Sequence, residues 1–99
     1  MERGGCIYIM TNKWKSTLYI GVSSDLRSRV IQHQTHVYPH SFTHKYNLEY
    51  CIYYEQFSLI EEAIAREKQV KKWRREKKEN LINSVNPQWR DLWEEIKDW

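Results

Sequence analysis

The sequence has few of the residues that mark a secreted or membrane-embedded protein. Its 99 residues include only two cysteines, three glycines and two prolines. Two cysteines are too few for a disulfide framework, and the apolar stretch at residues 6–10 is far shorter than a signal-peptide core or a membrane span. The sequence also contains no internal repeat, low-complexity tract or Pro/Gly-rich linker. We therefore expect one domain over residues 1–99, placed in a reducing cytoplasm and without a membrane partner.

Aromatic and basic side chains are the residues that the sequence has in excess. Aromatic residues make up 14% of the chain, beside sixteen lysines and arginines. This combination suits nucleic acid, through base stacking and phosphate neutralisation, although tryptophan also fills a small core efficiently. The positive charge is concentrated in residues 66–79, which carry eight basic and three acidic side chains. Such a run is either a solvated helix face or a phosphate-binding surface.

Hydrophobic patterning predicts three short strands in a small α+β domain. Residues 6–10, 18–21 and 49–55 are rich in aromatic and β-branched side chains, which favour strands. The first two are expected to form a hairpin around a polar loop. In a symmetric hairpin Tyr8 lies opposite Tyr19, so two phenols meet on one face of the sheet.

Helical periodicity and capping residues predict four helices. They are expected over about residues 25–34, over 59–73, through residues 81–82, and from Asn86 onward. The first helix starts at a Ser-Ser-Asp cap and the second at a capping box formed by Ser58 and Glu61. The last starts at Asn86-Pro87, an N-cap with proline at the first helical position, and its tryptophans form one packing face. Residues 35–47 are expected to be irregular.

Three polar groups fall where apolar residues belong. Arg29 and His33 share the helical stripe that must face the sheet, and Glu67 lies in the middle of another apolar stripe, where an uncompensated carboxylate is costly. With Tyr8 and Tyr19 they form a plausible phosphodiester hydrolysis site. Glu67 would hold a divalent metal, Arg29 would balance charge developing on the phosphate, and a tyrosine or His33 would move protons.

Structural alternatives stand beside each of these interpretations. The tyrosines can be ordinary cross-strand packing, and Arg29 can pair with Glu67 in a buried salt bridge. His36, His40 and His44 have local metal-ligand spacing, but Pro39 interrupts it and no clean zinc-finger context surrounds it. We expect those three histidines on a mobile loop near DNA rather than around zinc.

Four motifs follow one another along the chain: Cys6-Ile7-Tyr8, Tyr19-Ile20-Gly21, Asp25-Leu26 followed by Arg29 and His33, and Ala63 followed by Glu67. Their order resembles the GIY-YIG endonuclease superfamily, in its small stand-alone bacterial branch. The resemblance implies a β-β-α-β-α-α domain with a three-stranded antiparallel sheet, here extended by a C-terminal amphipathic helix. It also implies catalytic roles for Tyr8, Tyr19, Arg29 and His33, and one Mg²⁺ or Mn²⁺ on Glu67.

The sequence departs from the family pattern at three places. Cys6 stands where the family name has its first glycine, and Val22 stands where some relatives have a lysine. The family's late asparagine has three candidates, of which Asn86 is the one that also fits a helix cap.

We therefore expect a metal-dependent DNA endonuclease that acts in repair or recombination and selects DNA by structure rather than by sequence. The alternative is a non-catalytic nucleic-acid-binding module on the same scaffold, and a weaker third is a protein-interaction domain that uses the last helix. An accessory protein could supply specificity. The residues expected to contact DNA are Lys13, Trp14, Lys15, Arg66, Lys68, Lys71, Lys72, Arg74, Arg75, Lys77 and Lys78.

Overall fold

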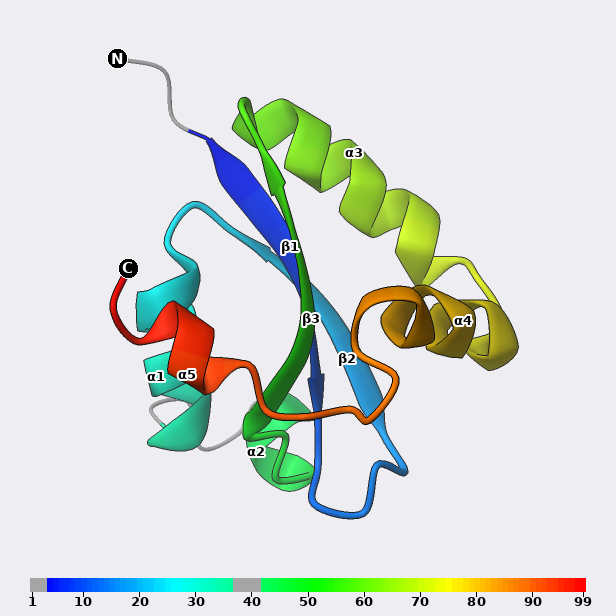
Figure 1. Cartoon of the computed structure of the whole chain (residues 1–99). Coiled ribbons are helices and arrows are strands. Elements are labelled where there is room, and N and C mark those ends of the chain that lie inside the picture. The colour runs from blue at the N-terminus through cyan, green and yellow to red at the C-terminus, as the bar shows by residue number, and fades with distance from the viewer. Residues whose placement is uncertain (1–3, 37–41) are drawn as a thin grey trace.

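One antiparallel sheet runs through the middle of the molecule (Figure 1). The structure, a computed structural model, describes residues 4–36 and 42–99. β1 (Gly5–Thr11) is the central strand, flanked by β2 (Leu18–Ser23) and β3 (Tyr50–Phe57). The helices of the described chain are α1 (Leu26–Gln34), α2 (Phe42–Lys45), α3 (Ile60–Lys71), α4 (Arg75–Val85) and α5 (Trp93–Ile96). The predicted sheet and the order β-β-α-β-α-α are confirmed, and α2 is an addition inside the segment predicted to be irregular.

The sheet separates two apolar layers. Because side chains alternate along a strand, Tyr8 and Met10 of β1 face the cluster that includes residues of α1 and α5. Ile7 and Ile9 face the opposite cluster, which includes residues of α3 and α4. Figure 1 shows the same division, with α1 and α5 on the left of the sheet and α3 and α4 on the right. The site residues are therefore distributed over two faces.

Helices α1 and α3 begin within one residue of their predicted starts, but the residues that cap them differ from those expected. Asp25 itself caps α1, because its carboxylate accepts from the Ser28 backbone N–H at 3.1 Å. At α3 the predicted capping box of Ser58 and Glu61 was wrong: the N-cap is Leu59, whose apolar side chain accepts no hydrogen bond, and Glu62 accepts from the Leu59 N–H at 3.2 Å. Among the described residues, no helix is long and apolar enough to cross a membrane.

The C-terminal segment differs most from the prediction. A helix was expected to begin at Asn86-Pro87, but Asn86 is instead the C-cap of α4, and the only helix after it is the short α5. Trp89 adopts a φ of 54° and joins the α3/α4 layer, whereas Leu92 joins the α1/α5 layer. The chain between them crosses the edge of β3, as Figure 1 shows in orange. The expectation of a single packed face was therefore wrong at Trp89, whereas Leu92, Trp93 and Ile96 do pack in one layer.

Asn86 holds the crossing in place. A bulge in β3 leaves Ile52 out of register with β1, since Ile9 pairs with Tyr53 while Met10 pairs with Cys51. The Asn86 amide is 3% exposed and donates to the carbonyls of Ile52 and Arg90, both at 2.9 Å. Its oxygen accepts from the Arg90 N–H at 3.0 Å. The side chain therefore satisfies backbone groups that the bulge and the loop would otherwise leave buried without partners.

Replacement of Asn86 by alanine should lower the free energy of unfolding by about 2–4 kcal/mol, because it removes three hydrogen bonds at a buried position. Asn80→Ala is the matched control: Asn80 is exposed on α4, and alanine there has the better helix propensity. Urea unfolding of both variants checks this. Equal stability of Asn86→Ala and Asn80→Ala would contradict the structural role of Asn86.

Candidate active site

Tyr8 occupies the centre of the α1-facing side of the sheet because Gly21 leaves room for its ring. The register pairs Tyr8 with Gly21 and Tyr19 with Met10, so the expectation that Tyr8 lies directly opposite Tyr19 was wrong. A Cβ atom at position 21 would meet the Tyr8 ring and hydroxyl well inside contact distance. The shift of two residues keeps both tyrosines on one face, and their ring centroids are 6.3 Å apart.

Tyr8 and His33 form a buried hydrogen-bonded pair between β1 and α1. The Tyr8 hydroxyl lies 3.0 Å from His33 Nε2, and the two side chains are 1% and 8% exposed. Tyr19 lies at the edge of this pair, with its ring centroid 5.8 Å from that of His33. Since β2 is an edge strand, Tyr19 is only partly buried. The structure thus brings three of the predicted residues into one cluster, with Arg29 on the preceding turn of α1.

The surroundings fix the protonation of this cluster. Burial and the Arg29 guanidinium lower the pKa of His33 to about 4, so its imidazole is neutral at neutral pH. Burial raises the pKa of the Tyr8 phenol, with Tyr19 adding to the rise and Arg29 opposing it. Tyr8 therefore stays protonated.

Glu67 is mostly buried, as the apolar stripe predicted, but it approaches the site from the other side of the sheet. Its side chain is 12% exposed and pairs with Lys71 at 3.0 Å. Helix α3 packs on the face opposite Tyr8 and contacts both β1 and β2. Among the described residues the alternative ion pair between Arg29 and Glu67 is absent.

The donors around Glu67 fit a hard cation better than zinc. The described residues contain no cluster of three or more His, Cys, Asp or Glu side chains able to hold a metal ion. Zinc requires three or four protein ligands, whereas Mg²⁺ keeps several waters and binds through one or two carboxylates together with substrate phosphate. One carboxylate that is 12% exposed, beside the half-exposed Lys71, meets that second requirement.

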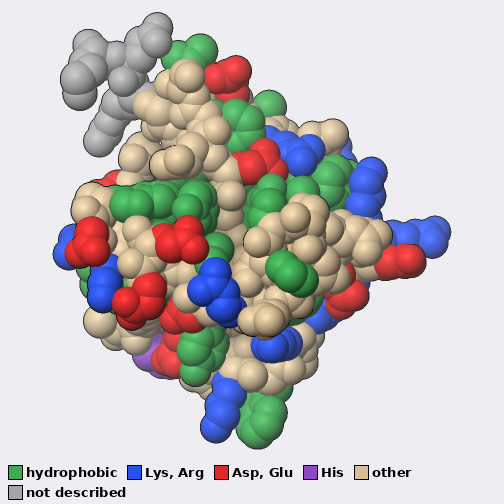
Figure 2. Space-filling view, viewed as in Figure 1, with side chains coloured by type: hydrophobic (Ala, Val, Ile, Leu, Met, Phe, Trp, Pro, Cys, Tyr) green, Lys and Arg blue, Asp and Glu red, His purple; other side chains and the backbone are tan. Residues whose placement is uncertain are grey.

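Some basic side chains of residues 66–79 interact with neighbouring side chains, and others form no ion pair with the described residues. Arg66 pairs with Glu55 at 3.1 Å and stacks on Trp73, and Lys77 lies 4.2 Å from the centroid of the same ring. Figure 2 shows Lys and Arg side chains projecting on the right, over α3 and α4. The side chains of the run that form no ion pair with the described residues are Lys68, Lys72, Arg74, Lys77 and Lys78.

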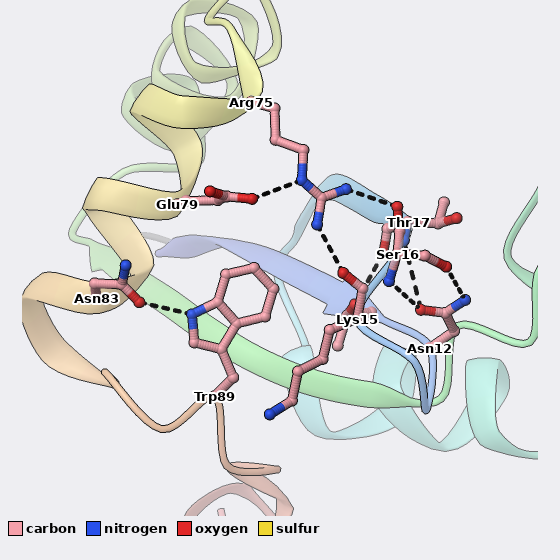
Figure 3. A network of polar contacts seen from close by, with 9 residues as sticks. Asn12, Lys15, Ser16, Thr17, Arg75, Glu79, Asn83 and Trp89 are labelled. Carbon is pink, nitrogen blue, oxygen red and sulfur yellow. Dashed lines mark hydrogen bonds and ion pairs between the residues drawn. The ribbon is translucent and has the colours of Figure 1, made fainter.

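Arg75 holds the loop of the β1–β2 hairpin in place, a role that was not predicted from the sequence. Its guanidinium donates to the carbonyls of Ser16 and Lys15, at 2.6 and 2.7 Å, and pairs with Glu79 (Figure 3). Asn12 closes the same loop from inside, accepting from the Ser16 N–H at 2.9 Å. A sequence pattern does not show which backbone carbonyls a distant side chain will contact, so nothing in the sequence predicted this interaction.

The histidine loop lies only partly within the described residues. His36 Nε2 lies 2.6 Å from a carboxylate oxygen of Glu49, and its ring meets that of His44 edge-on. His40 lies outside the described residues, so the expected position of the three histidines near DNA stays a prediction.

Comparison with known proteins places this geometry in a family. The model of the GIY-YIG catalytic domain family matches residues 4–80, a range that holds every predicted catalytic residue and Glu67. The chain is also similar to the solution NMR structure of the UPF0213 protein BH0048 from Bacillus halodurans, with 24% identity and a TM-score of 0.57. That similarity covers 90% of this chain and 93% of the other, and at this identity it shows the fold alone. No curated protein matches the chain.

Neutral His33 should make stability depend on pH. The lowered pKa means that the unfolded chain binds a proton between about pH 6.5 and 4 that the folded chain does not. The stability that His33 contributes is thus complete above about pH 6.5 and is lost as the pH falls. His33→Gln removes this titration. Between about pH 7 and 4.5 the unfolding free energy of the wild type should therefore fall further than that of the variant, and the two losses should differ by on the order of 1–3 kcal/mol. Urea unfolding at the two pH values measures the difference, and parallel losses would show that His33 is already charged in the folded protein.

Proposed function

The chain belongs to the GIY-YIG catalytic domain family, which supports a nuclease-type function, and from that premise we propose a divalent-metal-dependent DNA endonuclease. The observation that carries the proposal is the cluster on the α1-facing side of the sheet. It combines a buried Tyr8–His33 pair, a partly exposed phenol at Tyr19, and the Arg29 cation.

Arg29 supplies the charge that a phosphate needs. It forms no ion pair with the described residues, yet it lowers the pKa of His33, so its positive charge acts on this cluster. A guanidinium held in place before substrate arrives stabilises the extra negative charge of the transition state without reorganisation. Arg29 therefore serves as the phosphate-binding cation.

Tyr19 is the tyrosine that acts on the attacking water. Tyr8 is 1% exposed, so it does not contact solvent, and its raised pKa keeps the phenol protonated. Tyr19 is partly exposed on the edge strand and borders the His33 ring. In this assignment Tyr19 orients the water and, entering the step as the phenolate, takes its proton to become a phenol, while Tyr8 and His33 hold the wall of the site in one arrangement.

Glu67 would hold one Mg²⁺ or Mn²⁺ at the β2 edge, where α3 contacts the strand that carries Tyr19. When bound, such an ion stabilises charge on phosphoryl oxygens and lowers the pKa of water. A non-catalytic binding module gains nothing from a nearly buried carboxylate, which repels phosphate, so Glu67 favours the enzyme over the binder. The cations of residues 66–79 that form no ion pair would hold the DNA backbone. Selection by DNA structure or by an accessory protein belongs to the same proposal.

The test is the paired replacement of two glutamates on α3. Glu67→Gln should reduce plasmid nicking in Mg²⁺ by about a hundredfold or more, as expected when a group that stabilises the transition state is removed, and should lower stability by less than about 1 kcal/mol, because Lys71 is half-exposed. Glu61→Gln is the control, since Glu61 is exposed on the same helix.

Melting curves provide a second measurement. Mg²⁺ should raise the melting temperature of the wild type relative to EDTA, because an ion bound only by the folded state stabilises it, and this rise should vanish in Glu67→Gln. Nicking by Glu67→Gln at the rate of Glu61→Gln would remove Glu67 from the site.

A further inference from the structure

The tip of the β1–β2 hairpin presents a tryptophan to solvent. The Trp14 side chain is 77% exposed, so it does not cover the core. The Lys13 ammonium lies 5.3 Å from its ring centroid. Arg75 and Asn12 fix the backbone on either side of the tip (Figure 3). The ring is therefore an exposed apolar surface on a rigid support, an arrangement that folding does not require.

A second aromatic residue with the same kind of partner borders the same hollow. Tyr46 follows α2, is 39% exposed, and has the Lys45 ammonium 5.4 Å from its ring centroid. A hollow of about 260 Å³ is lined by Trp14, Tyr46 and Lys13, together with Tyr50, the amides of Asn12 and Asn47, and the Glu49 carboxylate. That carboxylate is engaged by His36 at 2.6 Å. The hollow thus combines aromatic faces, two nearby ammonium groups, two amides and one paired carboxylate.

We propose that this hollow is a stacking subsite for an unpaired nucleobase of the DNA substrate, an inference that rests on the proposed nuclease function. Every base has a π-face that stacks on tryptophan or tyrosine, and the two lysines are placed to neutralise the phosphates on either side of the stacked base. The volume lies below the roughly 300–1,000 Å³ of drug-sized ligand sites and suits one planar ring system. A cationic guest is disfavoured, because ammonium groups already lie over both rings.

The position of the hollow defines the substrate class. Trp14 and Tyr19 belong to one hairpin, and Tyr19 is the second residue of β2. A base held at the tip therefore comes from a strand that leaves the duplex close to the phosphate at the β2 edge. The subsite accordingly selects a flap or junction, in which a strand separates near the cleavage point, over continuous duplex.

The experiment measures binding of the full chain in EDTA, so that it does not depend on cleavage. Three fluorescent probes are compared by anisotropy: a duplex with a single-stranded flap, the same flap with abasic nucleotides, and the fully paired duplex. The wild type should bind the natural flap about ten- to a hundredfold more tightly than the abasic flap, because the abasic probe keeps the phosphates and loses the stacking. Trp14→Ala and Tyr46→Ala should each reduce that preference, and Trp14→Phe should retain most of it.

Trp99→Ala is the matched control, because Trp99 is also exposed but lines a different hollow beside Gly4 and Gly5, at the opposite end of β1. Unchanged flap binding by Trp14→Ala overturns the subsite, and so does equal weakening on all three probes. Unchanged flap binding is also the outcome expected if the hollow receives a protein partner. A wild type that nicks DNA in Mg²⁺ without preferring the natural flap overturns the subsite alone. A wild type that neither binds nor nicks DNA overturns the proposed function as well.

Discussion

The hydrogen bond between Tyr8 and His33 is the contact on which the rest of the site depends. It joins the central strand to α1 across 25 residues of sequence, and it exists because Gly21 leaves the space that the Tyr8 ring fills. Once α1 is held there, Arg29 lies one turn before His33 on the same helix. Burial keeps the phenol protonated and the imidazole neutral. The close approach of Gly21 to Tyr8 thereby allows the hydrogen bond that positions α1, and the burial of that bond sets the protonation of both side chains.

The sheet imposes a second constraint, because it separates Glu67 from that face. Helix α3 contributes to the opposite apolar layer and contacts both β1 and β2. At an edge strand such as β2, a phosphate could meet groups from both sides of the sheet. The hairpin that supplies this edge is held by Arg75, so a residue of the basic run has a structural role, while its predicted contact with DNA stays a prediction.

Local patterns predicted the elements of the fold, and non-local contacts account for what they missed. The strands, α1, α3 and the burial of Glu67 follow from periodicity within each segment. The pairing of Tyr8 with Gly21 required the register, which a hairpin loop of unknown geometry does not fix. The last helix was overpredicted because Trp89 and Leu92 share helical spacing yet pack on opposite layers, while Asn86 bonds a bulged strand far away in sequence.

The central claim is that Tyr8 organises the site while Tyr19 acts in it, and two phenylalanine variants test it directly. Tyr19→Phe should slow single-turnover cleavage by about 10²–10⁴-fold and should leave the unfolding free energy within about 0.5 kcal/mol of the wild type. Tyr8→Phe should lower the unfolding free energy by about 1–3 kcal/mol, because it removes the phenol that pairs with buried His33. Its folded fraction should cleave far faster than Tyr19→Phe. The reverse pattern, with cleavage lost in a stable Tyr8→Phe and retained in Tyr19→Phe, would contradict the account.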